Sequence, residues 1–155
     1  MVAKAKRWAD KMNKPAIPEV KMLEHGFADL QQNSKMLIPT PRLIENYLLQ
    51  TLAGAAVDVK QMRKDLAAEY HADGTCPLTT GIFLRIVTEY TNEQHQNGTP
   101  TNQLIPVWRA VHPGLSFWKK LSFDPGWLVD LQKAEGIMPE NPKPTARKKA
   151  TRKVD

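Results

Sequence analysis

The sequence predicts a small, mainly α-helical domain with a winged helix-turn-helix arrangement. Apolar residues recur at helical spacing in four segments, and each segment has start and stop signals of its own. Two of these segments are joined by a tight turn that contains glycine and are followed by an irregular stretch with further turn signals. That order is typical of a helix-turn-helix followed by short wing strands. The length of 155 residues allows one domain and little more.

The first two predicted helices have clear N-terminal signals. Thr40 is a favourable N-cap, Pro41 follows at the first helical position, and Gly54 ends the helix. Asp58 begins the second helix, where Gln61 completes a capping-box pattern. The apolar face of the first helix consists of Leu43, Ile44, Tyr47, Leu48 and Leu52. The buried stripe of the second consists of Val59, Met62, Leu66 and Tyr70, and a turn at residues 72–74 follows it.

The third and fourth predicted helices follow the same logic. The third begins at Cys76 with Pro77 at the first helical position, and it frays through residues 92–94. The fourth covers residues 126–135 and ends at Gly136. The side chains expected to face inward on the third helix are Phe83, Ile86, Val87 and Tyr90, with Ile82 alongside. On the fourth helix they are Trp127, Leu128 and Leu131.

The remaining segments are less regular. The predicted parts of the chain are a basic leader at residues 1–39, a domain at residues 40–137 and a basic tail at residues 138–155. Within the leader we expect a short amphipathic helix near residues 5–12 and then an extended segment, residues 13–39, packed over the domain with room for one short helix. The apolar residues 104–108 form either a strand-like wing or a buried extended segment. The tail is rich in proline and lysine and lacks apolar periodicity, which predicts disorder.

The positive charge of the chain is concentrated at its two ends. The net charge is +6, with +4 in residues 1–21, +4 in residues 136–155 and −2 in residues 22–135. Basic ends attract polyanions such as double-stranded DNA without reading their sequence. The alternative is that they are solvated tails that keep the protein soluble.

Several classes of protein are disfavoured by composition. The chain has no apolar run long enough for a membrane span and no secretory signal, so we expect no membrane association. A single cysteine, Cys76, excludes an internal disulfide and is typical of a reducing, cytoplasmic setting. The histidines at 25, 71, 95 and 112 lack metal-ligand spacing, and no motif for a cofactor is present, so neither a metal nor a cofactor is expected. The sequence carries no signal that sets the oligomeric state.

Four segments resemble one known family. The run at residues 75–83, Thr-Cys-Pro-Leu-Thr-Thr-Gly-Ile-Phe, resembles the signature helix of small prokaryotic proteins classed with the DNA-binding domain of O6-methylguanine-DNA methyltransferase. Residues 105–109, Ile-Pro-Val-Trp-Arg, resemble the Pro-x-Trp-Arg segment of these proteins. Residues 123–126 resemble their Tyr-Pro-Gly-Gly turn, and residues 131–136 resemble their closing helix. With the Arg-Trp-Ala at 7–9, the resemblance covers residues 7–137.

The resemblance implies a DNA-binding fold without the alkyl-transfer chemistry of the repair enzymes. Those enzymes dock a winged helix-turn-helix on DNA, flip the damaged guanine out, and move the alkyl group to a cysteine thiolate. In this sequence Val107 stands where the cysteine would be, and Trp108 stands where the activating histidine would be. Arg109 keeps the arginine of the family, whereas Leu78 falls at or near the arginine that enters the base stack. We therefore expect an alkyltransferase-like protein that is not an alkyltransferase at this position.

Candidate site residues follow from the resemblance and from residue type. The residues expected to contact DNA are Thr79, Thr80, Arg85, Trp108, Arg109, Lys119 and Lys120. Six of these seven residues have a structural alternative: the threonines in helix packing, Trp108 in the core, Arg109 paired with a nearby helix C-terminus, and the two lysines in a solvated turn. Cys76 is either a nucleophile activated by the helix N-terminus or a small buried N-capping residue.

The sequence is compatible with three functions. The first is a non-catalytic, alkyltransferase-like DNA-binding protein connected with recognition of alkylated bases. The second is a protein-interaction or regulatory domain that kept the fold and lost the DNA role. The third is an alkyl-transfer enzyme that uses Cys76.

Overall fold

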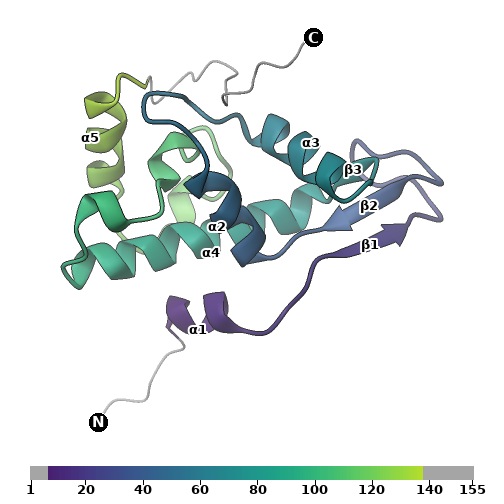
Figure 1. Cartoon of the computed structure of the whole chain (residues 1–155), viewed down its shortest axis with the longest axis horizontal. Coiled ribbons are helices and arrows are strands. Elements are labelled where there is room, and N and C mark those ends of the chain that lie inside the picture. Colours follow the sequence, from purple (N-terminus) through teal and green to yellow (C-terminus); the bar gives the residue numbers. More distant parts are fainter. Residues whose placement is uncertain (1–6, 138–155) are drawn as a thin grey trace.

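Residues 7–137 are described by a computed structural model of the chain (Figure 1). The helices are α1 (Trp8–Asn13), α2 (Pro41–Leu49), α3 (Val59–Glu69), α4 (Pro77–Gln96) and α5 (Gly126–Ala134). The strands are β1 (Glu19–Met22), β2 (Lys35–Ile38) and β3 (Gly74–Thr75). Three single-turn 3₁₀ helices, η1 (Thr101–Gln103), η2 (Val107–Arg109) and η3 (Trp118–Lys120), lie between α4 and α5. The described part of the chain is therefore mainly helical with a small sheet.

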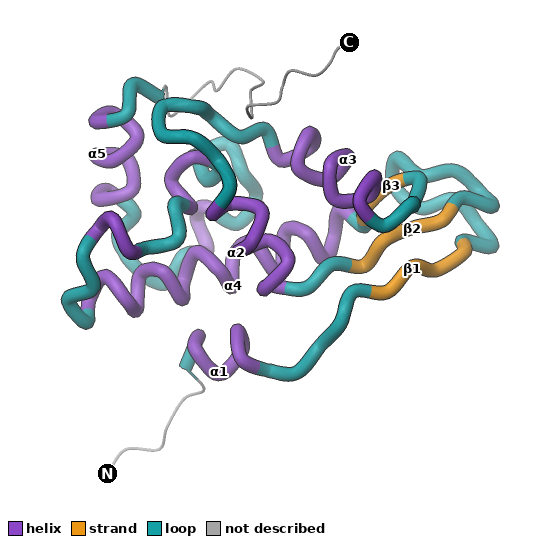
Figure 2. Tube along the Cα trace, viewed as in Figure 1, coloured by secondary structure: helices purple, strands orange, loops and turns teal. Residues whose placement is uncertain are grey.

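The sheet lies at one end of the molecule, and α5 lies at the opposite end (Figures 1 and 2). Its strand order is β1-β2-β3, with β1 antiparallel to β2 and β2 parallel to β3. The extended segment predicted for residues 13–39 is thus a β-hairpin joined to the turn between α3 and α4. Asp73 fastens that junction, because its backbone N–H donates to the carbonyl of Lys35 and its carboxylate accepts the N–H of Lys35 at 2.7 Å.

The central element is α4, which packs against α1, α2 and η2. Its most deeply buried side chains include Leu84 and Val87 together with three threonines, Thr80, Thr88 and Thr91. Each threonine hydroxyl donates to the carbonyl four residues earlier on the helix, so burial leaves no unpaired donor there. Of the side chains predicted to face inward, Val87 is buried and Phe83, Ile86 and Tyr90 pack partly buried against the core, whereas Ile82 is about half exposed. The predicted face misses Leu84 because the threonines beside it look like solvent-facing residues.

The predicted starts of the helices agree with the structure better than the predicted ends do. Thr40 caps α2 through its hydroxyl, and Cys76 caps α4 with Pro77 next to it, as predicted. The helix α2 ends at Leu49, so the predicted inward position of Leu52 is wrong, and its side chain is exposed. Asp58 precedes α3 as predicted but makes no capping bond. The capping box is wrong, since the Gln61 side chain donates to Asp65 on its own helix.

The segment after α4 contains no strand in the described range. Of the two alternatives for residues 104–108, the structure supports the buried segment, because all five side chains are buried in the core. The turn η2 then places Val107 and Trp108 inward. The wing strands expected after α4 are therefore absent from residues 97–137.

Two further expectations concern the basic tail and membrane spans. The basic tail at residues 138–155 and the first six residues lie outside the described residues. Within residues 7–137 no helix combines the length and the apolar character that a membrane span requires.

The helix α1 is attached to the domain at a few defined points. Glu93 on α4 accepts the backbone N–H groups of Trp8 and Ala9 at 2.8 and 3.1 Å, which satisfies free donors at the start of α1. Met12 inserts into the main core and is almost completely buried. The Arg42 side chain donates to that of Asn13 at the other end. Through these contacts, α1 belongs to the packed structure.

We predict that Glu93→Ala loosens α1 while the rest of the domain stays folded. Loss of a carboxylate that caps a helix N-terminus costs about 1 kcal/mol. Hydrogen exchange followed by mass spectrometry should show faster exchange in residues 8–13 and little change in α4. The control is Glu69→Ala on the exposed side of α3, and equal exchange of α1 in both variants would contradict the assignment.

Candidate functional site

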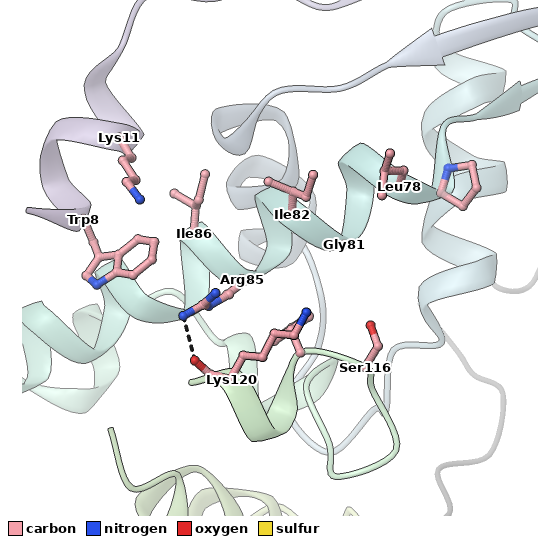
Figure 3. Close-up of a pocket in the computed structure, with 11 residues that line it drawn as sticks. Trp8, Lys11, Leu78, Gly81, Ile82, Arg85, Ile86, Ser116 and Lys120 are labelled. Carbon is pink, nitrogen blue, oxygen red and sulfur yellow. Dashed lines mark hydrogen bonds between the residues drawn. The ribbon is translucent and has the colours of Figure 1, made fainter. Parts of the chain in front are cut away.

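A groove of about 340 Å³ runs along the N-terminal half of α4 (Figure 3). Its walls come from α1, from the exposed face of α4 and from the segment that contains η3. The lining residues are Trp8, Lys11, Pro77, Leu78, Gly81, Ile82, Arg85, Ile86, Ser116, Phe117 and Lys120. Leu78 and Ile82 are 61% and 49% exposed, which is unusual for large apolar side chains on a central helix. This groove is the most distinctive surface feature on α4.

The groove is lined by cations and by no acidic residue. Lys11, Arg85 and Lys120 contribute positive charge from three different elements, and Lys119 is exposed next to Lys120. Residues 22–135 carry a net charge of −2. Arg85, Lys119 and Lys120 come from this region and Lys11 comes from the basic leader, so positive charge is concentrated at the groove although residues 22–135 are net negative, and such a concavity attracts anions.

Arg85 occupies the middle of the groove and has contacts on several sides. Its guanidinium donates to the backbone carbonyl of Lys120 at 2.6 Å and lies 3.4 Å from the carboxylate of Glu89. The guanidinium carbon is 5.4 Å from the ring centroid of Trp8, and the ammonium of Lys11 is 4.2 Å from the same centroid. Cation–π attraction at these distances favours both cations beside the Trp8 ring. Trp8 thus helps to keep two positive charges at the rim of the groove.

Glu89 is the residue that joins the groove to the core. Its side chain is only 1% exposed, and it accepts the backbone N–H of Ser122 at 2.8 Å as well as the Ser122 hydroxyl. A buried carboxylate needs such partners, because desolvation penalises its charge. The bonds hold the segment that carries Lys119 and Lys120 against α4. The sequence signal for Glu89 is its spacing of four residues from Arg85 on one helix.

The structure separates the predicted DNA-contacting residues into three groups. Arg85 and Lys120 meet in the groove, and Lys119 lies beside it. Thr80 is fully buried and bonds within α4, and the hydroxyl of Thr79 is also inaccessible. Trp108 and Arg109 lie on η2 and do not line the groove.

Trp108 and Arg109 bind one carboxylate, that of Glu135 at the end of α5. The Arg109 guanidinium donates to both Glu135 oxygens at 2.9 and 3.1 Å, and the Trp108 indole N–H donates at 3.0 Å. The carboxylate also accepts the backbone N–H of Gly54 at 2.9 Å. The third guanidinium nitrogen donates to the carbonyl and hydroxyl of Thr51. This network joins η2, α5 and the loop after α2.

The network determines the protonation of Glu135. Burial raises the pKa of its carboxyl group, but the hydrogen bonds from Arg109, the Gly54 backbone and Trp108 favour the charged form. Their combined effect holds the pKa of Glu135 below its ordinary value. The structural alternative for Arg109 is pairing with a nearby helix C-terminus, and in the structure Arg109 binds the side chain of Glu135, the residue that follows α5.

A second cavity, of about 480 Å³, lies against the same network. It is lined by Leu49, Thr101, Asn102, Leu104, Pro106, Trp108, Arg109 and Glu135. Val107, which replaces the reactive cysteine in the resemblance, is fully buried and does not line this cavity. The segment 106–109 therefore borders a hollow but presents no nucleophile to it.

Cys76 has a structural role in the fold. Its sulfur accepts the backbone N–H of Thr79 at 3.5 Å, and its side chain packs in a small apolar cluster with Leu30 and Met36. It does not line the groove on α4. Across residues 7–137 no group of three or more His, Cys, Asp or Glu side chains is arranged to hold a metal ion.

Comparisons of the chain with protein-family models, with curated proteins and with solved structures find no match. The geometry of the groove and the residues that carry the resemblance are therefore the basis for any functional assignment.

We predict that Glu135→Gln destabilises the domain by about 2 kcal/mol, because the charge-assisted bonds to Arg109, Trp108 and Gly54 are weakened. Urea unfolding followed by tryptophan fluorescence measures the effect. Glu69→Gln, an exposed glutamate on α3, is the matched control and should change stability little.

The same substitution has a pH signature. Since the folded state lowers the pKa of Glu135, its ionised form adds stability above the ordinary pKa of 4.5. That stability is lost as the pH falls through the lower pKa of the folded state. The difference in unfolding free energy between wild type and Glu135→Gln should therefore shrink below pH 4.5, and a difference that stays constant on acidification would contradict the network.

Proposed function

We propose that this protein is a non-catalytic, alkyltransferase-like DNA-binding protein that places the groove of α4 against double-stranded DNA. The observation that carries the proposal is the set of cations, Lys11, Arg85 and Lys120, around the exposed face of α4, with no carboxylate among the lining residues. Lys and Arg side chains neutralise phosphates, and this term supplies much of the affinity of DNA-binding proteins.

The order of elements supports the same reading. In this proposal α3 and α4, joined by residues 70–76, are the two helices of a helix-turn-helix, and the second helix faces DNA. Leu78, Ile82 and Arg85 lie on the solvent side of α4, where a recognition helix presents its side chains. In this proposal the β1–β2 hairpin, which is joined to the turn through β3, is the wing-like element.

The proposal is non-catalytic because no nucleophile faces a ligand at the expected place. Val107 has no reactive group and is fully buried. Cys76 is buried, and its sulfur is used as a helix cap. The alkyl-transfer alternative therefore lacks an accessible thiolate, which such chemistry requires.

One observation favours a second candidate, a protein-interaction domain. The exposed Leu78 and Ile82 form an apolar strip on the helix, and such a strip fits an amphipathic partner segment. The basic rim would then select an acidic partner. DNA binding remains the first candidate because the basic ends, each with a net charge of +4, add sites for the same polyanion.

The test is binding of fluorescein-labelled duplex DNA, measured by anisotropy over a range of salt concentrations. Lys120→Glu should weaken binding about tenfold and reduce the slope of log affinity against log salt by about 1, because one phosphate contact is lost. Lys133→Glu makes the same charge change on α5, outside the groove, and is the control. Equal losses in both variants would mean that total charge, and not the groove, decides binding.

A truncation separates the domain from its ends. The fragment must begin at residue 7, because a start at residue 22 would remove Met12 from the core and Trp8 and Lys11 from the groove. If residues 7–137 bind DNA and Lys120→Glu weakens that binding, the groove is the binding surface. If only the full chain binds, and Lys120→Glu has no effect, the proposal is wrong.

A further inference from the structure

The strand β1 is an edge of the sheet that exposes apolar side chains. It pairs with β2 on one side only, and all four of its residues are exposed (Figure 2). Val20 and Met22 are 42% and 60% exposed, and Ile17 just before the strand is 78% exposed. A free edge with apolar side chains is a template for pairing with another strand.

The backbone N–H and C=O groups of Val20 and Met22 are directed away from β2, toward the open side of β1. Their partners on β2 are Leu37 and Lys35. The carbonyls of these two residues accept N–H groups from Cys76 and Asp73, on the β3 side of β2. In an antiparallel pair, a residue that turns its backbone groups away from the partner strand lies opposite one that does the same. The N–H and C=O groups of Val20 and Met22 are thus directed at the free edge.

The charges on β1 are ordered so that the strand complements itself. Glu19 and Lys21 flank Val20, and both are exposed. In an antiparallel pair of two β1 strands centred on Val20, Glu19 of one copy lies opposite Lys21 of the other, and the reverse pair forms as well. A pair centred on Lys21 would place like charges opposite each other, which is destabilising. Only the pairing centred on Val20 forms both Glu19–Lys21 pairs and also uses the backbone groups of Val20 that face away from β2.

We propose that two copies of this chain associate through β1, antiparallel and centred on Val20, so that the two sheets become continuous across a twofold axis. The interface is isologous, as is usual for homodimers. Val20 lies opposite the buried Leu37 on the core-facing side of the sheet, so the second copy extends an apolar surface that already exists. Charge complementarity favours a second copy as the occupant, because β1 itself carries the Lys and the Glu that this pairing requires. The proposal does not depend on DNA binding.

The test is a charge exchange read by sedimentation equilibrium of the full chain, without DNA, from micromolar to millimolar concentrations. Wild type should show a reversible monomer–dimer equilibrium. Glu19→Lys alone and Lys21→Glu alone should each weaken dimerisation by about tenfold or more, because each places two like-charge pairs across the axis. The double variant Glu19→Lys/Lys21→Glu restores opposite charges at both pairs and should recover the wild-type dissociation constant.

Two controls make the result specific. Lys133→Glu changes the net charge by the same amount as Lys21→Glu but lies on α5, and it should leave dimerisation unchanged. Circular dichroism should show the same helix content in all variants, because residues 19 and 21 are exposed and outside the core. A wild-type chain that is monomeric throughout, or a double variant no better than the single ones, would overturn the proposal. A monomeric wild type would mean that Lys21 and Pro18 prevent the edge strand β1 from pairing with another chain.

Discussion

The buried carboxylate of Glu89 is the constraint on which both the fold and the groove depend. A glutamate that is 1% exposed on the central helix must be paired, and its partners are Arg85 and Ser122. Because Arg85 faces the groove and Ser122 follows η3, one ionic group fixes the position of the groove's central cation and of the segment that carries Lys119 and Lys120. Removal of the Glu89 charge would therefore alter both the packing of this segment against α4 and the position of the cations at the groove.

Two other glutamates also use their carboxylates in contacts inside the domain and not at the groove. Glu93 holds α1 through two backbone N–H groups, and Glu135 holds η2 and the loop after α2. Residues 22–135 have a net charge of −2, but these carboxylates are turned toward backbone donors and arginines. Lysines 119 and 120 face solvent. The charges that line the groove thus depend on which carboxylates are bound inside the domain, and a count of charged residues does not reveal this.

The sequence was informative where a local rule decides the structure. Thr40-Pro41 and Cys76-Pro77 mark helix starts because capping and the fixed φ of proline act within a few residues. It was uninformative where a distant residue decides. The role of Arg109 depends on Glu135, which is 26 residues away, and β2 forms because its partners lie near residues 20 and 75. On α4 the threonines obscured the inward face, since they satisfy their hydroxyls on their own helix.

The arrangement of the groove limits the kind of nucleic-acid recognition that the proposed function can involve. Base-specific reading in the major groove needs side chains with donors or acceptors directed at base edges. At the exposed face of α4 the outermost side chains are Leu78 and Ile82, which have neither, and Arg85 already donates to the Lys120 carbonyl. The remaining free charges are lysines, which act as point charges on phosphates. We therefore expect affinity that depends strongly on salt and discriminates weakly among sequences, with apolar contact to thymine methyl groups as the main source of preference.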